Sequence, residues 1–210
     1  EEYLKHSDTL TVVRVMAGSF GPATAKVSSS ATTATTALGN IHSFNLETLA
    51  DGTIMNNEDK TVNTNNVNDS GSKHNIRYEV SNVNNAKGTF TLSIRAGNDN
   101  IKRKQTLESF NNVSMDVSSP NFISKVIGTQ TQEVKTDGTT KYLELTGDYP
   151  NKSRFVRVSS VNMSVSDYLD ENGSIRAIGL SGSLPAAGSG SAHGGFSGGA
   201  DGFSGFDALG

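Results

Sequence analysis

The sequence predicts an α+β fold that is mainly β, with antiparallel strands and one short capped helix at about residues 120–127. These elements are expected to be attached to a further strand, at about residues 10–16, that belongs to a partial α/β core. Three kinds of observation predict this class: short segments in which apolar and polar residues alternate, turn dipeptides between them, and a single pair of helix start and stop signals.

The clearest alternation lies in Thr89–Arg95. Phe90, Leu92 and Ile94 fall on one face of an extended chain, and the Thr, Ser and Arg side chains fall on the other. This pattern is typical of a half-buried strand. Around it, the stretch from Lys87 to Gly128 contains the strongest structural signals of the chain.

The helix is predicted from its ends. Ser119 is a good N-cap residue, Pro120 suits the first helical position, and Gly128 stands just past the last apolar residue. Because Ile123, Val126 and Ile127 share one side of this helix, we expect it to lie on a sheet.

Near the start of the chain, Leu10–Met16 carries apolar groups on both faces, which favours a strand buried on both sides. We expect this strand to belong to a core that is completed by residues outside this chain. The following segment, Ala17–Asn40, is rich in Gly, Ala, Ser and Thr and lacks bulky apolar residues, so it predicts a linker or an extended arm. Ile41–Met55 predicts a strand, a turn at Asp51-Gly52 and a second strand.

The next strand is predicted at Ile76–Val80, with Ile76, Tyr78 and Val80 facing inward and Arg77 and Glu79 outward. Ser81–Gly88 then predicts a hairpin to the Phe90 strand, whereas most of Asn56–Asn85 reads as surface loop.

After the turn at Gly97–Asn100, irregular spacing in Gln105–Met115 favours a bulged strand. Thr129–Lys135 and Tyr142–Leu145, on either side of Asp137-Gly138, predict a second hairpin. Arg154–Val158 predicts the last strong strand. Gly179–Gly210 holds half of the glycines of the chain and predicts a loop that is not part of a core.

Composition excludes several classes of function. The chain has 210 residues, a net charge of -3 and no cysteine, which rules out disulfides and thiolate metal sites. Nothing resembles a basic footprint for nucleic acid, since the one dense positive run, Lys102-Arg103-Lys104, fits a solvated hairpin tip. No run is long enough to predict a membrane span or a signal peptide. Because Glu1 is not an initiator methionine, the chain is expected to be processed or to be part of a longer protein.

No catalytic, cofactor-binding or metal-binding residues are predicted. Gly195–Gly199 matches the G-x-S-x-G pattern around Ser197, but no buried strand precedes it and no histidine follows it. His6, His42, His74 and His193 are scattered without the spacing of a metal site. The sequence therefore predicts a protein that is not an enzyme and has no cofactor.

Several segments, in their order and spacing, resemble the tail sheath proteins of contractile bacteriophages, especially the large sheaths of T4-like and cyanophage-like viruses. The segments are Leu10–Val15, Phe44–Asn57, Ile76–Val80, Gly88–Arg95, Leu107–Gly128, Leu143–Gly147, Tyr149–Val158 and the glycine-rich Gly198–Gly202. The resemblance covers most of the chain, although no single segment is specific.

The resemblance implies a structural subunit that polymerises as a helical sleeve around the tail tube and contracts to drive the tube through the host envelope. It implies the N-terminal portion of such a protein: a core strand and linker over residues 1–40, an inserted β-rich outer domain over 41–165, and a glycine-rich connection over 166–210. The implied partners are other sheath subunits, the tail tube and the baseplate, and the implied location is the virion after assembly in the host cytoplasm. The alternative is a β-rich carbohydrate-binding or adhesion module on a virion surface.

Overall fold

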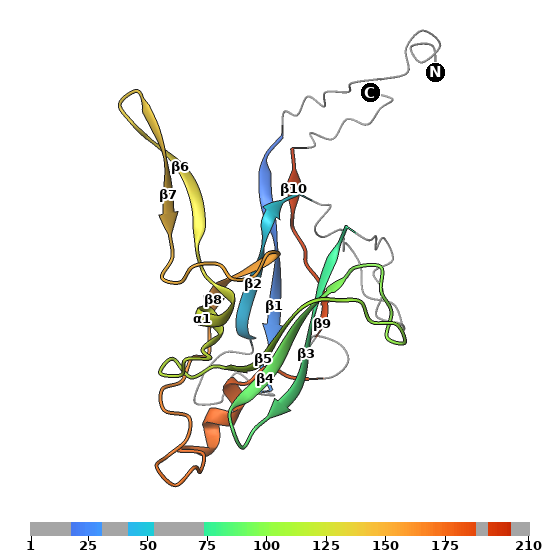
Figure 1. Ribbon diagram of the computed structural model, residues 1–210, viewed down its shortest axis with the longest axis vertical. Helices are drawn as coiled ribbons and strands as arrows, with labels where there is room; N and C mark the ends of the chain where they lie inside the picture. The colour runs from blue at the N-terminus through green and yellow to red at the C-terminus, as the bar shows by residue number, and fades with distance from the viewer. Residues whose placement is uncertain (1–17, 31–41, 53–73, 188–192, 203–210) are drawn as a thin grey trace.

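The computed structural model describes residues 18–30, 42–52, 74–187 and 193–202, and shows a mainly β fold (Figure 1). The mainly β class with antiparallel strands is confirmed. The strand expected at Leu10–Met16 lies outside the described residues.

Two four-stranded antiparallel sheets pack face to face as a β-sandwich. The first has the order β10-β1-β2-β8, formed by Ala200–Asp201, Phe20–Ser28, His42–Asp51 and Val156–Val161. The second has the order β5-β4-β3-β9, formed by Thr106–Ser114, Thr89–Ala96, Ile76–Asn84 and His193–Gly195. A separate hairpin of β6 (Thr131–Asp137) and β7 (Thr140–Thr146) projects from this body (Figure 1).

The core lies between the sheets. Phe44 of β2 stacks on Phe90 of β4, with 5.9 Å between ring centroids and 17° between ring planes. Leu92 and Ile94 of β4 are fully buried in the same cluster, as the alternation in this strand predicts. One contiguous core therefore joins the two sheets.

Strand β1 corrects the prediction of a linker over Ala17–Asn40. Within Phe20–Ser28, the side chains of Ala23, Ala25 and Val27 alternate with polar ones and are buried against β2. Two of the three inward residues are alanines, so the segment has the period of a strand without its usual bulky side chains. A boundary at residue 40 would separate two hydrogen-bonded strands of one sheet.

The described parts of the glycine-rich C-terminal segment contribute residues to the core, contrary to the prediction of a loop that is not part of a core. Leu184 follows the 3₁₀-helix Ile178–Ser183, and both Leu184 and Phe196 are fully buried. Phe196 packs edge-on against Tyr78 at 6.2 Å, next to the pairing of β9 with β3. The few apolar residues in this segment are therefore enough to hold it on the sandwich, and a boundary at residue 165 would also cut the core.

The two predicted hairpins are confirmed, β3 with β4 and β6 with β7. Strand β5 has the predicted bulges, seen as shifts in its register with β4. Strand β2 confirms the first strand predicted in Ile41–Met55, and the second lies outside the described residues beyond Gly52. Arg77 and Arg95 were expected to face outward, but each is only 1% exposed.

Helix α1 spans Ile123–Ile127 and begins later than predicted. The residue at its N-cap position is Phe122, because Ser119 instead closes a preceding turn, in which its hydroxyl accepts a hydrogen bond from the Asn121 amide at 3.1 Å. The predicted end is confirmed at Gly128, whose φ of 111° favours glycine. Ile123 and Ile127 are buried, and the helix contacts β5 and β8.

The packing makes a direct prediction. Leu92→Ala should lower the free energy of unfolding by about 2–5 kcal/mol, because it leaves a cavity between the sheets. The matched control is Leu143→Ala on the projecting hairpin, which should change it by less than about 0.5 kcal/mol. Urea unfolding followed by circular dichroism measures both, and equal losses would contradict the described core.

Candidate functional site

The two ends of the described chain lie side by side. Phe20 and Gly21 of β1 pair with Asp201 and Ala200 of β10. Beyond them, the Gly18 amide donates to the Gly202 carbonyl at 2.9 Å, and the Gly202 amide donates to the Ser19 carbonyl at 2.8 Å. We call this pairing of residues 18–21 with 200–202 the stem (Figure 1). The first and last described residues of the unit therefore lie next to each other.

Ser197 lies in the continuation of this pairing. Its backbone exchanges two hydrogen bonds with Thr24, both at 2.8 Å, and its side chain is exposed. A nucleophile elbow needs a serine on a sharp turn between a strand and a helix, and Ser197 sits in a β-bridge instead. At Gly199 an added Cβ would lie 2.5 Å from the Gly52 carbonyl oxygen, so glycine here permits close approach to β2.

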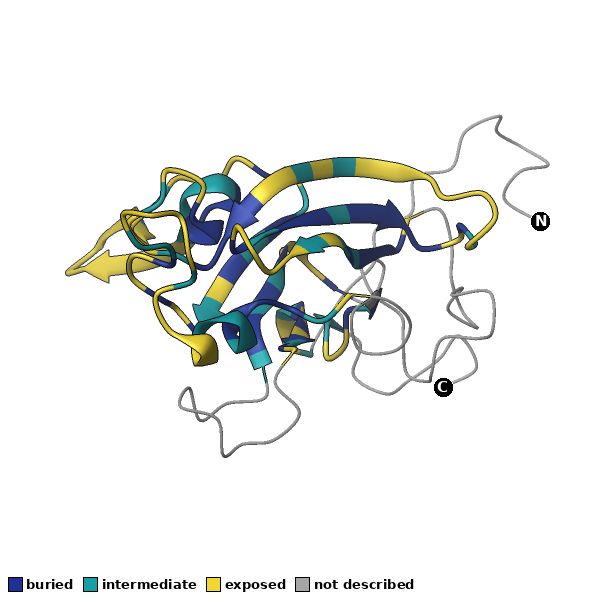
Figure 2. Ribbon diagram, turned by 90° about the horizontal axis from the view of Figure 1, so that it is seen from below, coloured by how far each residue is buried: buried dark blue, intermediate teal, exposed yellow. Residues whose placement is uncertain are grey.

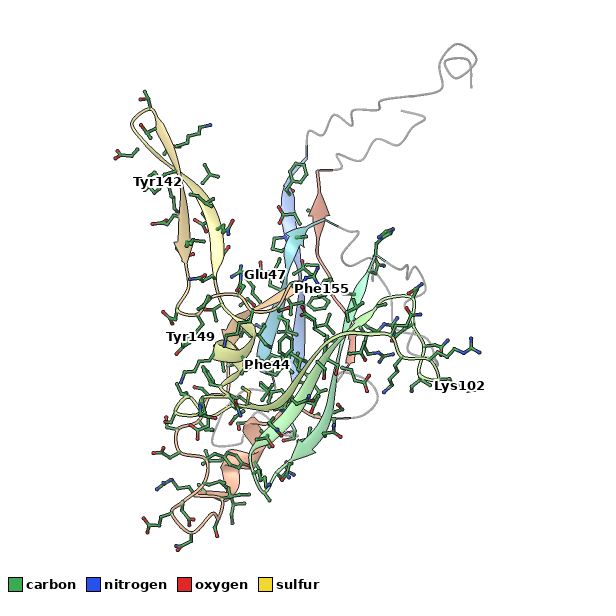
Figure 3. The ribbon with its side chains drawn as sticks, viewed as in Figure 1. Phe44, Glu47, Lys102, Tyr142, Tyr149 and Phe155 are labelled. Atoms are coloured by element: carbon green, nitrogen blue, oxygen red, sulfur yellow. The ribbon has the colours of Figure 1, made fainter. Side chains whose placement is uncertain are left out.

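A groove of about 600 Å³ lies between the start of β6 and the end of β2. Most of its lining is polar, and Glu47, labelled in Figure 3, forms an ion pair with Arg157 at 2.6 Å inside it. Its lining residues are Pro22, Glu47, Thr48, Leu49, Asp51, Gln130, Thr131, Gln132, Glu133, Asn151 and Arg157. This lining contains carboxylates and amides but no aromatic side chain.

The β6–β7 hairpin has two unlike faces. Val134 lies directly opposite Leu143, and Leu145 lies on the same face, with exposed fractions of 67%, 55% and 56%. The other face carries Glu133, Lys135, Tyr142 and Glu144. Figure 2 shows nearly all of the hairpin as exposed, and Figure 3 places Tyr142 well away from the sandwich. The turn has Gly138 with a φ of 58° at its first central position, as a tight hairpin turn requires.

One lysine links two glutamates on the polar face. Glu133 and Glu144 lie directly opposite each other, a like-charge pair that destabilises a hairpin. Lys135 contacts Glu133 at 2.8 Å and Glu144 at 3.6 Å. The hydrogen bond and charge of Lys135 lower the pKa of Glu133, and Glu133 in turn raises the pKa of Lys135.

A buried ionic cluster lies at the end of the second sheet where β4 runs into the turn that follows it. Arg95 binds Asp99 through two hydrogen bonds, of 2.7 and 2.8 Å, and Glu79 through a third, of 2.6 Å. The Asp99 carboxylate also accepts a hydrogen bond from the backbone amide of Gln105, and the Arg77 guanidinium donates one to the Gly97 carbonyl. These contacts fasten the turn after β4, whose tip at Lys102–Lys104 is exposed as predicted (Figure 3).

The sequence patterns did not reveal this cluster, because an alternating strand places Arg77 and Arg95 on the solvent side. The only signal was the spacing of Arg95 and Asp99 across a turn. The side chain of Asp99 reaches back to cover that face of the sheet, which is how two arginines come to be buried.

The sites weighed in the sequence are not brought together. His42 begins β2 and His74 precedes β3, while His193 lies in β9 and His6 is outside the described residues. Among the described residues, no three His, Cys, Asp or Glu side chains are grouped as a metal site would need. In the same part of the chain, no helix is both long and apolar enough to span a membrane.

Removing one partner of the buried cluster should be costly. Arg95→Leu would leave Asp99 buried without its main counter-charge, so it should lower the free energy of unfolding by about 3–5 kcal/mol. Lys104→Leu removes the exposed partner of Glu79 and should cost about 1 kcal/mol or less. Urea titrations at pH 7 compare the two, and a smaller loss for Arg95→Leu than for Lys104→Leu would contradict the cluster.

The same cluster predicts acid sensitivity. Burial raises the pKa of Glu79, but hydrogen bonds and charges from Lys104 and Arg95 outweigh it, so the pKa lies below the ordinary value of 4.5 for a glutamate. A depressed carboxyl pKa stabilises the fold above pH 4.5, and this contribution is lost as the pH falls through the folded-state pKa. Glu79→Gln should therefore flatten the dependence of stability on pH below 4.5. Unfolding by urea between pH 3 and 7 tests this, and unchanged curves would refute it.

Comparisons of this chain with known protein families, with curated proteins and with solved structures found no match. What the chain does is therefore inferred from its residues and their geometry. The two features on which this inference rests are the stem and the projecting hairpin.

Proposed function

We propose that this chain is part of the subunit of a contractile phage tail sheath, and that residues 18–202 form its inserted, outward-facing domain. The subunit would polymerise around the tail tube and contract to drive the tube through the host envelope. The role is structural rather than enzymatic, and its partners are neighbouring subunits, the tube and the baseplate of the virion.

The observation that carries this proposal is the stem. A domain inserted into a host domain must begin and end close together, so that the host fold is not disturbed. The ends of the described chain meet this condition, because Gly202 accepts a backbone hydrogen bond from Gly18 and donates one to Ser19. The domain bounds proposed on this ground are wider than those expected from the sequence. The reason is that β1, β9 and β10 belong to the two sheets, and Leu184 and Phe196 to the core between them.

The proposal includes a mechanical role. The sheath subunit would have two packings that differ by a few kcal/mol, and a small bias per subunit would become decisive when many copies change together. The domain would move as one block, since the contiguous core between the sheets joins its first and last strands. Movement relative to the rest of the subunit would then occur at the stem, where residues 18–21 and 200–202 pair.

The alternative, a carbohydrate-binding module, has weaker support. The groove beside β6 supplies carboxylates and amides, but its lining holds no aromatic side chain on which a sugar ring would stack. No further observation in the described residues favours this alternative.

Deleting the domain tests the proposal. The gene product that carries this sequence should form tubular sleeves when expressed and viewed by negative-stain electron microscopy. Replacing residues 19–201 with a short Gly-Ser linker should preserve the sleeves but reduce their outer diameter, because the stem ends are adjacent. The matched control is a linker that replaces residues 138–139 at the hairpin tip, which should leave the diameter nearly unchanged.

Two outcomes would overturn the proposal. The first is that the gene product forms no tubular assembly under any condition that keeps it folded. The second is that sleeves form in a single diameter only, with none converting to a shorter and wider form.

A further inference from the structure

The projecting hairpin leaves an apolar face uncovered. Val134, Leu143 and Leu145 are each more than half exposed, although they line one continuous face of the ribbon. An isolated two-stranded hairpin is marginally stable in water, because it has no other layer against which to bury such a face. The hairpin projects from the sandwich with this face exposed.

The edges of the hairpin are open as well. In the part of the chain that the structure describes, β6 and β7 form a sheet of their own, and each strand pairs only with the other. An open strand edge presents unpaired backbone groups, onto which another strand can add. The hairpin therefore offers one open edge on each strand, and a strand added at either edge places its side chains next to those of the apolar face.

We propose that this partner is a second copy of the chain, and that β7 of one copy adds antiparallel to the outer edge of β6 of the next. Val134 would lie opposite Leu145, and Lys135 opposite Glu144. This inference names a contact surface for the assembly proposed above, and rests on that proposal only for its biological setting.

Charge selects this register over its neighbours. Repeating the register of the hairpin itself would place Glu133 opposite Glu144 of the next copy, a second like-charge pair. A shift of two residues one way places Val134 opposite Lys141. The same shift the other way places Val134 opposite Leu145 and gives each Glu144 a lysine across the contact.

Head-to-tail addition also uses both edges. Each copy would give its β7 edge to one neighbour and its β6 edge to another, so every internal copy has its edges covered. A two-fold pairing of β6 with β6 would leave both β7 edges open. Head-to-tail contacts generate rings or helical filaments rather than closed dimers, as a sleeve requires.

The chain contains no cysteine, so introduced cysteines report this contact without background. Two single variants, Val134→Cys and Leu145→Cys, should form a mixed disulfide when the two proteins are combined and mildly oxidised. Facing residues of antiparallel strands lie about 4.5–5.5 Å apart between Cα atoms, within the range of a disulfide. The control combines Val134→Cys with Ile178→Cys, since Ile178 is 94% exposed and lies far along the chain in the 3₁₀-helix.

The mixed pair should cross-link several-fold more than the control. A yield equal to that of the control would overturn the proposal. Predominant Val134→Cys homodimers would overturn it in favour of two-fold β6 pairing, and cross-linking to another protein in place of this chain would assign the face to a different partner.

Charge exchange gives a second measurement. Lys135→Glu is added to the Val134→Cys variant, where it would face Glu144 of the other copy, and should abolish cross-linking. Adding Glu144→Lys to the Leu145→Cys variant should then restore it. Unchanged circular dichroism and urea unfolding would show that the sandwich is intact in each variant. If sleeves form in the microscope and cross-linking fails, the hairpin inference fails while the sheath proposal stands; if cross-linking succeeds without sleeves, the reverse holds.

Discussion

The contact between the two sheets through Phe44 and Phe90 is the constraint on which the other elements depend. The chain is only 34% hydrophobic, so neither sheet could form a core alone. Sharing one core forces strands from both ends of the chain onto the same body, as β1 and Phe196 show. The first and last described strands, β1 and β10, are neighbours at the edge of the first sheet, which places Gly18 next to Gly202.

Sequence reasoning predicted the elements in which bulky apolar residues alternate, such as β4, and the hairpins closed by Gly and Asn or Asp. It missed β1 because two of its three buried positions are alanines, which carry little of the apolar signal of a strand. It placed the start of α1 at Ser119 because a serine that closes a turn and one that caps a helix look alike in sequence. Both errors arise where a tertiary contact decides the local structure.

Less of the candidate site could be predicted. The stem depends on a pairing between residues about 180 positions apart, which no local pattern encodes. The burial of Arg77 and Arg95 depends on Asp99 reaching back across a turn. By contrast, the apolar face of the hairpin can be predicted from the sequence once its turn is placed at Asp137-Gly138. Val134, Leu143 and Leu145 then lie on the same face of the two strands. That this face is not covered by the sandwich required the structure.

The division between a body with a core and a hairpin without one has a mechanical consequence. A contact built only from the hairpin would bury a small area, so each copy would bind its neighbour weakly. Weak contacts suit an assembly that must change its packing, since a strong contact would fix a single arrangement and a small bias per copy could not move it. The sandwich can stay rigid through such a change because its core contributes nothing to the contact. In the proposed sheath, the stem at Gly18 and Gly202 would transmit the displacement of the rest of the subunit to this domain as a whole.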